Sequence, residues 1–215
     1  RMTGNEYIIS LRDGKASRGD ETGRQAVEFL QEIGQYFNEG FGATDYATAQ
    51  SMFLDGKSAM YYIGDWEQAA MLDAYNAGKV DYFYLPTAEG AKTGANEFCV
   101  NSGIGMAFNT QTFDAKTKDF IKYVIENYGK IYAGRMQMSP IKTELPEDIQ
   151  FTDLYLRIRE DMEKTGKNFL KPWDTYLDVD TNTVMQDNML LLAAGDMTVD
   201  DFIKIVDDAI ASNVK

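Results

Sequence analysis

Residues 51–66, which read SMFLDGKSAMYYIGDW, decide the fold of this chain. The pattern predicts the end of a helix, a turn containing glycine, a buried strand over residues 59–63 and a second tight turn at Gly64. This second turn places Asp65 and Trp66 at the start of the next helix. In α/β folds, ligand contacts lie where a strand ends in a glycine turn and a helix begins. Trp66 is therefore a candidate binding residue, although most tryptophans are well buried and a core position also fits.

Further motifs accompany this stretch in a fixed order. The stretch itself contains F-x-x-G-K-x-A-M, a short apolar run and G-x-W. The other motifs are Thr44-Asp45-Tyr46-Ala47, Tyr84-Leu85-Pro86, Asn101-Ser102-Gly103-Ile104-Gly105 and residues 194–201. In order and spacing, this set resembles the extracellular solute-binding proteins of carbohydrate ABC transporters, the maltose-binding-protein-like family. The resemblance covers nearly the whole chain and says little about the ligand.

The resemblance implies an α/β fold. It implies a periplasmic-binding-protein-like lobe of type II, with a mixed β-sheet flanked by helices, that lacks most of the N-terminal lobe. Residues 1–105 and 149–215 are then expected to form the C-terminal lobe, and residues 106–148 to belong to the other lobe. The apolar face of residues 106–148 would lack its partner sheet. Since large exposed apolar patches drive association, we expect this chain to self-associate or to repack these helices.

Composition narrows the classes of function. The net charge of −13 argues against nucleic acid or an anionic membrane surface as a partner, because both need clustered Lys and Arg. The absence of histidine excludes Ser-His-Asp and Cys-His catalysis and His-based zinc sites. Cys99 is the lone cysteine, so it forms no internal disulfide, and its apolar surroundings predict a buried position. No run is long and apolar enough to cross a bilayer.

No cofactor and no metal is expected. Residues 178–182 copy the first half of a calcium loop, but Thr183 replaces its glycine and Met189 occupies the position of its bidentate glutamate. A helix cap at Asp180 explains this segment better. The pair Gly103 and Gly105 lacks the third glycine of a dinucleotide-binding motif. Small residues there suit close approach of the backbone to a ligand or a neighbouring strand.

Periodicity and capping residues predict the remaining elements. Strands are expected over residues 7–11, 80–85 and 98–108. Helices are expected from Asp20 or Thr22 to about residue 38, over 45–53, 66–77, 114–129, 130–135, 147–166 and 181–194, and after Thr198, which with Asp201 resembles a capping box.

The chemistry of sugar recognition defines the candidate site. A pyranose has apolar C–H faces and a rim of hydroxyls, so aromatic platforms and carboxylate or amide groups bind it together. Trp66 and Trp173 are expected to supply the platforms. Trp173, on a loop containing proline, is expected to be the more exposed of the two. The other candidate ligand-binding residues are Asp65, Tyr46, Asp174, Tyr62, Asn101 and Gly103.

We therefore expect an extracytoplasmic substrate-binding component of an ABC importer, periplasmic or anchored as a cell-surface lipoprotein. It would bind a sugar or oligosaccharide between its lobes, dock on the permease subunits and catalyse no reaction. The resemblance implies that about half of the protein precedes residue 1. The start of the chain, Arg1-Met2-Thr3-Gly4, shows neither a signal segment nor a lipoprotein cysteine.

Three alternatives stay open. A glycoside-acting enzyme would also present aromatic residues and carboxylates, but it needs an acid and a base or nucleophile roughly 5–10 Å apart, and no motif singles out such a pair. The chain could instead be a non-catalytic surface interaction module. As a binding protein, it could carry a peptide or another polar metabolite in place of a sugar.

Overall fold

The computed structural model describes residues 4–86, 89, 91, 98–100, 105–139, 144–164 and 169–213. Within it the chain divides into two compact units. The first unit comprises Arg1–Ala49, Tyr84–Val100 and Asn168–Lys215. The second unit comprises Gln50–Phe83 and Asn101–Lys167.

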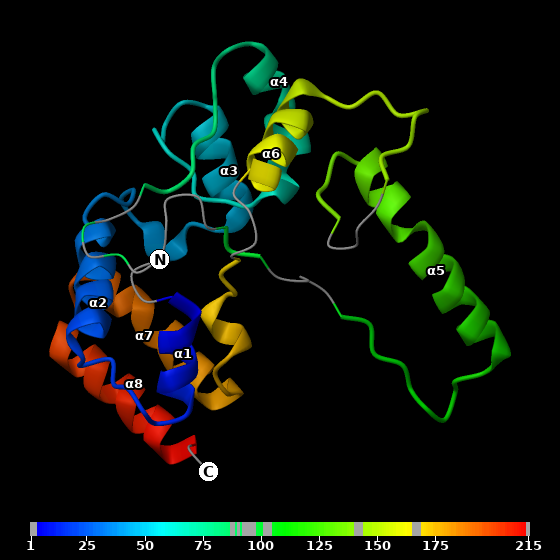
Figure 1. Ribbon diagram of the computed structural model, residues 1–215. Coiled ribbons are helices and arrows are strands. Elements are labelled where there is room, and N and C mark those ends of the chain that lie inside the picture. Colours follow the sequence, from blue (N-terminus) through cyan, green and yellow to red (C-terminus); the bar gives the residue numbers. More distant parts are fainter. Residues whose placement is uncertain are drawn as a thin grey trace. The chain divides into compact units, whose positions relative to one another are not determined.

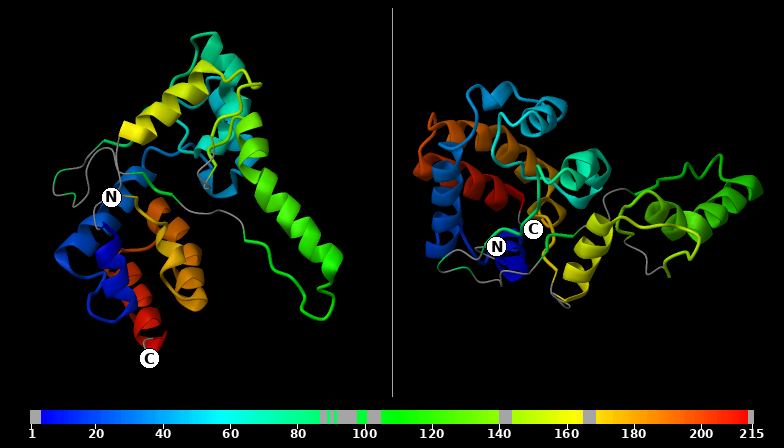
Figure 2. Two further views of the ribbon diagram at one scale, coloured as in Figure 1. Left: turned by 45° about the vertical axis from the view of Figure 1, so that its right-hand side comes forward. Right: turned by 90° about the horizontal axis from the view of Figure 1, so that it is seen from above.

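The first unit is built from helices. In Figure 1, the blue helices α1 and α2 gather with the orange and red helices α7 and α8, and both views of Figure 2 agree. Helix α2 packs against α7 and α8, and α7 packs against α8. The helices of this unit are α1 (Gly4–Arg12), α2 (Glu21–Gly34), α7 (Val179–Ala194) and α8 (Val199–Asn213), with the short 3-10 helices η1 (Phe41–Ala43) and η3 (Trp173–Thr175). Helix α3 (Tyr46–Leu54) begins in this unit and ends in the second.

The hydrophobic core of the first unit lies among these helices. On α8, Phe202, Val206 and Ile210 recur every four residues and are buried on one face. Burying each such side chain stabilises the fold by about 1.5–3 kcal/mol. The other members of this core are Ile8, Leu11, Val27, Leu177, Met185, Leu192 and Ile203.

A glycine sets the closest approach between α2 and α7. A Cβ atom on Gly34 would lie 2.1 Å from the carbonyl oxygen of Ala193, so only glycine fits there. The buried positions of α2 are Gly23, Val27 and Gly34. Phe29 and Phe37, two aromatic residues spaced for one helical face, are exposed instead.

Side-chain caps fix the starts of the two C-terminal helices. Before α8, the Asp201 N–H donates to the Thr198 hydroxyl at 3.1 Å, which confirms Thr198 as the cap. The Asp201 carboxylate accepts from this hydroxyl at 2.6 Å, whereas in a complete capping box it would accept from the Thr198 N–H. The predicted cap at Asp180 is wrong by two residues. Asp178 caps α7, because its Oδ1 accepts from the Thr181 N–H at 2.9 Å.

The second unit contains η2 (Asp65–Glu67), α4 (Gln68–Asn76), α5 (Ala115–Gly134) and α6 (Asp153–Lys164). Helix α4 packs against α6. Polar contacts attach residues 81 and 82 to α6. Arg157 Nη1 lies 2.7 Å from Asp81 Oδ1, and its guanidinium carbon lies 4.5 Å from the ring centre of Tyr82. The Tyr82 hydroxyl donates to Asp161 Oδ2 at 2.7 Å.

Helix α5 is buried only toward its C-terminal end, at Gly129 and Ala133. Its N-terminal cap is the predicted one, since Asp114 Oδ1 accepts from the Thr117 N–H at 2.8 Å. The apolar residues Phe120 and Tyr123 are exposed. Self-association of the chain stays a prediction.

The expected mixed β-sheet is not found among the described residues, and this part of the fold-class prediction is corrected. The β-pairing there is an isolated parallel bridge between Cys99 and Leu170. Residues 59–63 and 80–85 adopt no regular secondary structure. A strand requires a neighbour that satisfies its backbone N–H and C=O groups, and none pairs with these segments in the described ranges. Tyr62, expected within a buried strand, is 79% exposed, and Cys99 is exposed rather than buried.

Three further predictions of secondary structure are also corrected. Residues 7–11 form part of α1, not a strand, because Tyr7, Ile8 and Leu11 have the spacing of a helical face. Helix α5 continues through Gly129 without a break, since an internal glycine costs only about 1 kcal/mol. Helix α6 begins six residues later than the predicted residue 147, where Thr152 Oγ1 accepts from the Tyr155 N–H at 3.2 Å.

No helix in the described residues combines the length and apolar character needed to cross a membrane.

Candidate functional site

The glycine turn at Gly64 shapes the surroundings of Trp66. Gly64 (φ −93°, ψ 172°) precedes η2, in which Trp66 is the central residue. A Cβ atom on Gly64 would lie 2.1 Å from Cζ3 of the indole, so the Trp66 ring folds back over the glycine. Trp66 nevertheless remains 56% exposed. The turn therefore holds an aromatic ring at the surface against a residue that has no side chain.

Asp65 lies directly before this indole, and its carboxyl is partly buried. Burial raises the pKa of Asp65 above its usual value, and the Met138 N–H, which donates to Asp65 Oδ2 at 3.3 Å, partly offsets that rise. The carboxylate thus retains acceptor capacity in a poorly solvated setting. Such a group suits hydrogen bonding to a hydroxyl.

Two residues that the sequence analysis missed follow Trp66. Glu67 and Gln68 are both buried at the start of α4. The Gln50 amide donates to Glu67 Oε2. Neither polar atom of the Gln68 amide has a partner in the described part of the chain. Their position directly after Trp66 was the available signal, but polar residues at a helix start are usually exposed.

The structure places the predicted site residues in different units. Tyr62, Asp65 and Trp66 lie in the second unit, where Asp65 and Trp66 share the turn η2. Tyr46, Trp173 and Asp174 lie in the first unit. Tyr46 is exposed as the first residue of α3, whose predicted cap is confirmed: Asp45 Oδ1 accepts from the Thr48 N–H at 2.8 Å. Asn101 and Gly103 lie outside the described residues.

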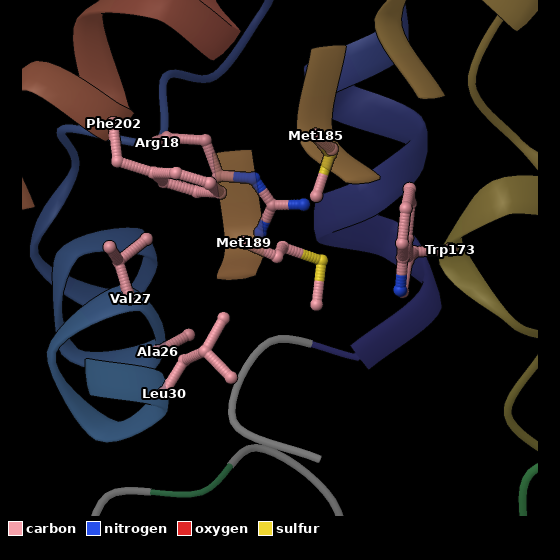
Figure 3. A pocket seen from close by; sticks show the side chains of 8 residues that line it. All are labelled: Arg18, Ala26, Val27, Leu30, Trp173, Met185, Met189 and Phe202. Carbon is pink, nitrogen blue, oxygen red and sulfur yellow. The ribbon is translucent and has the colours of Figure 1, made fainter. Parts of the chain in front are cut away.

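Trp173 differs from its prediction. It was expected to be more exposed than Trp66, but it is partly buried and packs against the core of the first unit. The Pro172 loop turns into η3 and directs the indole inward, so the exposure predicted from proline alone is wrong. Trp173 lines a pocket of about 140 Å³, shown in Figure 3, together with Arg18, Ala26, Val27, Leu30, Met185, Met189 and Phe202.

Among the described residues, no cluster of three or more acidic or cysteine side chains could hold a metal ion. The chemistry available at Trp66 is that of a binding surface, with an exposed aromatic residue next to the Asp65 carboxyl in the same turn.

Comparison with known proteins identifies the family. The family described as bacterial extracellular solute-binding protein matches residues 1–154, which is more than half of the chain. This chain belongs to the bacterial extracellular solute-binding protein family. Membership places this solute-binding protein outside the cytoplasm, and its curated relatives are named as periplasmic.

Two curated relatives of this solute-binding protein are each named a probable sugar-binding periplasmic protein, one from Brucella suis biovar 1 and one from Brucella melitensis biotype 1. Each is 27% identical to the chain over 77 residues, which is 35% of this chain and 18% of the relative. The match therefore spans less than a fifth of their length.

Two solved structures share the fold of this solute-binding protein. A chitin oligosaccharide binding protein superposes with a TM-score of 0.81 and 18% identity, over 99% of this chain and 54% of the other. A chain from work on xylan utilization by the thermophilic bacterium Caldanaerobius polysaccharolyticus gives a TM-score of 0.69 and 22% identity, over 96% and 57%. The chain thus has a periplasmic-binding-protein-like fold and spans about half of each solved chain.

Proposed function

We propose that this chain is part of the substrate-binding component of an ABC importer and that the intact protein binds a sugar or oligosaccharide. Membership of the solute-binding family supports this proposal, as do relatives and a structural neighbour whose names refer to sugar or chitin oligosaccharide. The role is binding and not catalysis.

The observation that carries the proposal is the exposed Trp66 indole held against Gly64. An exposed indole leaves a flat apolar face in water, and stacking a pyranose on it removes the face and the sugar C–H groups from water together. Because the Gly64 turn already orients the ring, little side-chain entropy is lost on binding. A surface indole without such support would bind more weakly.

A carboxylate next to Trp66 in the chain would bind the sugar hydroxyls. The Asp65 carboxylate accepts hydrogen bonds from such hydroxyls. With a net charge of −13, the chain favours an uncharged sugar over an anionic one.

The remaining predicted site residues belong to the same proposal. Tyr46, Tyr62, Trp173, Asp174, Asn101 and Gly103 stay candidate ligand contacts in the intact protein. We also propose that residues 1–105 and 149–215 form one lobe and that residues 106–148 belong to the other. Binding in the cleft between these lobes would then present the protein to the permease subunits, from the periplasm or from a lipid anchor.

A thermal-shift screen of neutral oligosaccharides on the intact protein tests the proposal. A ligand at 100 times its Kd stabilises the protein by about 2.7 kcal/mol and raises its Tm. Calorimetry with the best sugar should then show about 10- to 100-fold weaker binding for Trp66→Ala, since an aromatic platform contributes about 1–3 kcal/mol. Tyr36→Ala, at a 78% exposed tyrosine after α2, is the matched control and should bind normally.

The same experiment separates the alternatives. Unchanged affinity in Trp66→Ala would refute the stacking role. Release of shorter sugars during incubation would favour a glycoside-acting enzyme. A Tm that rises with peptides and with no sugar would identify a different cargo.

A further inference from the structure

Arg18 is a buried cation in the first unit. The residue is 6% exposed. Its backbone N–H donates to Asp207 Oδ1 at 2.8 Å, and the Ser17 hydroxyl donates to the other oxygen of the same carboxylate. The Arg18 guanidinium makes no hydrogen bond and no ion pair within the described part of the chain, and its Nε is fully buried.

This arrangement is costly without a ligand. An arginine stays protonated in proteins, so its burial removes a charge from water without neutralising it. Burial lowers the pKa of Arg18, whereas Tyr7 and Asp207 raise it, so these two groups partly compensate the charge. No protein group in the described residues accepts a hydrogen bond from the guanidinium. An anion that reached it would recover a desolvation cost that the fold already bears.

The pocket around Arg18 is otherwise apolar. In Figure 3 the guanidinium lies among the labelled side chains, with Val27 and Leu30 of α2 on one side and Trp173 on the other. The Met185 and Met189 thioethers, from α7, stand beside it. Thioethers and an indole accept almost no hydrogen bonds, so Arg18 is the one strong polar side chain lining this pocket.

We propose that this pocket binds a small aliphatic monocarboxylate, with the carboxylate on the Arg18 guanidinium and the hydrocarbon chain against Met185, Met189 and Trp173. A guanidinium pairs with a carboxylate through two parallel N–H···O bonds. A cavity of about 150 Å³ holds a molecule of the size of benzene, which has about six non-hydrogen atoms. The 140 Å³ pocket therefore fits butyrate or isobutyrate.

Other ligand classes fit this pocket less well. A pyranose would place most of its hydroxyls against apolar walls without partners. A neutral hydrocarbon would leave the guanidinium unpaired. An inorganic anion would pair with it but leave the apolar walls unfilled. This site is therefore distinct in chemistry from the sugar site at Trp66, and the absence of sugar binding would leave it untouched.

Trp173 provides a direct reporter. The chain has two tryptophans, so Trp66→Phe leaves Trp173 alone as the source of indole fluorescence. In this background, butyrate titrated into the full chain should change the emission in a saturable way, with a Kd of about 1 mM for a ligand of this size. Butyramide has the same shape without the charge and should bind at least about 10-fold more weakly.

Variants locate the interaction. Arg18→Met keeps an unbranched apolar side chain, removes the guanidinium and should weaken butyrate binding by about 10- to 100-fold. Arg24→Met is the matched control, because Arg24 pairs with Asp200 at 2.5 Å on the surface of the same unit and its loss changes the net charge equally. Binding should be unchanged in Arg24→Met. Ala26→Leu fills the pocket while Arg18 remains, and should also abolish binding, which keeps the test decisive if Arg18→Met does not fold.

Four results would contradict a carboxylate site at Arg18. Equal binding of butyramide and butyrate would show an apolar cavity without anion recognition. Phosphate that binds as tightly as butyrate and is lost in Arg18→Met would show a general anion site. No saturable response to butyrate up to about 100 mM, or full binding in both Arg18→Met and Ala26→Leu, would refute the site.

Discussion

The two compact units differ in how they hold apolar side chains. The first unit buries a cluster contributed by α1, α2, α7 and α8. Among the described residues of the second unit, the buried hydrophobic side chains are Ala133, Leu154 and Tyr155. Hydrophobic burial is the main favourable term in folding, so most of the stability arises in the first unit. The second unit presents aromatic side chains to solvent.

The two tryptophans show the same difference between buried and exposed apolar side chains. Trp173 packs against the core and lines the Arg18 pocket, whereas Trp66 lies against a glycine and keeps more than half of its surface exposed. The same residue type thus serves two purposes that are decided by its neighbours. An indole that packs against a core serves to stabilise the fold. An indole that lies against a glycine turn and is exposed can serve as a binding surface.

The largest expected effect is on stability. Trp173→Ala should lower the free energy of unfolding by about 2–4 kcal/mol, because it removes a large side chain packed on the core. Trp66→Ala should change it by less than about 0.5 kcal/mol, as substitutions at exposed positions usually do. Urea denaturation followed by circular dichroism measures both values. A loss for Trp66→Ala as large as that for Trp173→Ala would remove the distinction between the two rings.

An intermediate effect is expected at the glycine under Trp66. Gly64→Ala places a methyl group where the indole lies, so the ring must swing away. We expect sugar affinity to fall by about 10-fold while the free energy of unfolding changes by less than about 1 kcal/mol. Gly42→Ala is the matched control, because a Cβ atom there would make only an ordinary contact of 3.4 Å with Leu190 Cδ2. Full sugar affinity in Gly64→Ala would show that the orientation of the ring is irrelevant.

Local patterns in the sequence were sufficient to predict where several helices begin. The caps at Asp45, Asp114 and Thr198 are confirmed, because each depends on residues three apart in the chain. The predictions of strands were wrong because strands depend on contacts between distant parts of the chain. A strand is defined by its partner, and a run such as residues 80–85 can instead attach by side chains to a helix, as Asp81 and Tyr82 do to α6.

The candidate site was predictable only in part. The Gly64 turn places Asp65 and Trp66 side by side in the chain, and this could be predicted because the three residues are adjacent in the sequence. The inward direction of Trp173 could not be predicted, because it depends on packing against α2, α7 and α8, which no local pattern encodes. The Arg18 pocket was missed for the same reason. From the sequence, Arg18 is a single arginine in a polar segment and is predicted to be exposed. Only the fold places it among Met185, Met189 and Trp173.

The smallest expected effect concerns the carboxyl beside Trp66. Burial raises the pKa of Asp65 in the folded state, so the folded protein binds a proton more readily there than the unfolded chain does. Stability is then lost as pH rises from the unfolded pKa, about 3.9, through the higher folded pKa, and this loss persists at neutral pH. Asp65→Asn removes the titration, and its oxygen can still accept from the Met138 N–H. The variant should have a higher Tm than the native chain at pH 7, and this advantage should shrink toward pH 4. Asp119→Asn, on the exposed surface of α5, controls for the change in net charge. A Tm advantage of Asp65→Asn that grew as the pH fell would show that the Asp65 carboxylate is stabilised in its charged form, contrary to the effect of its burial.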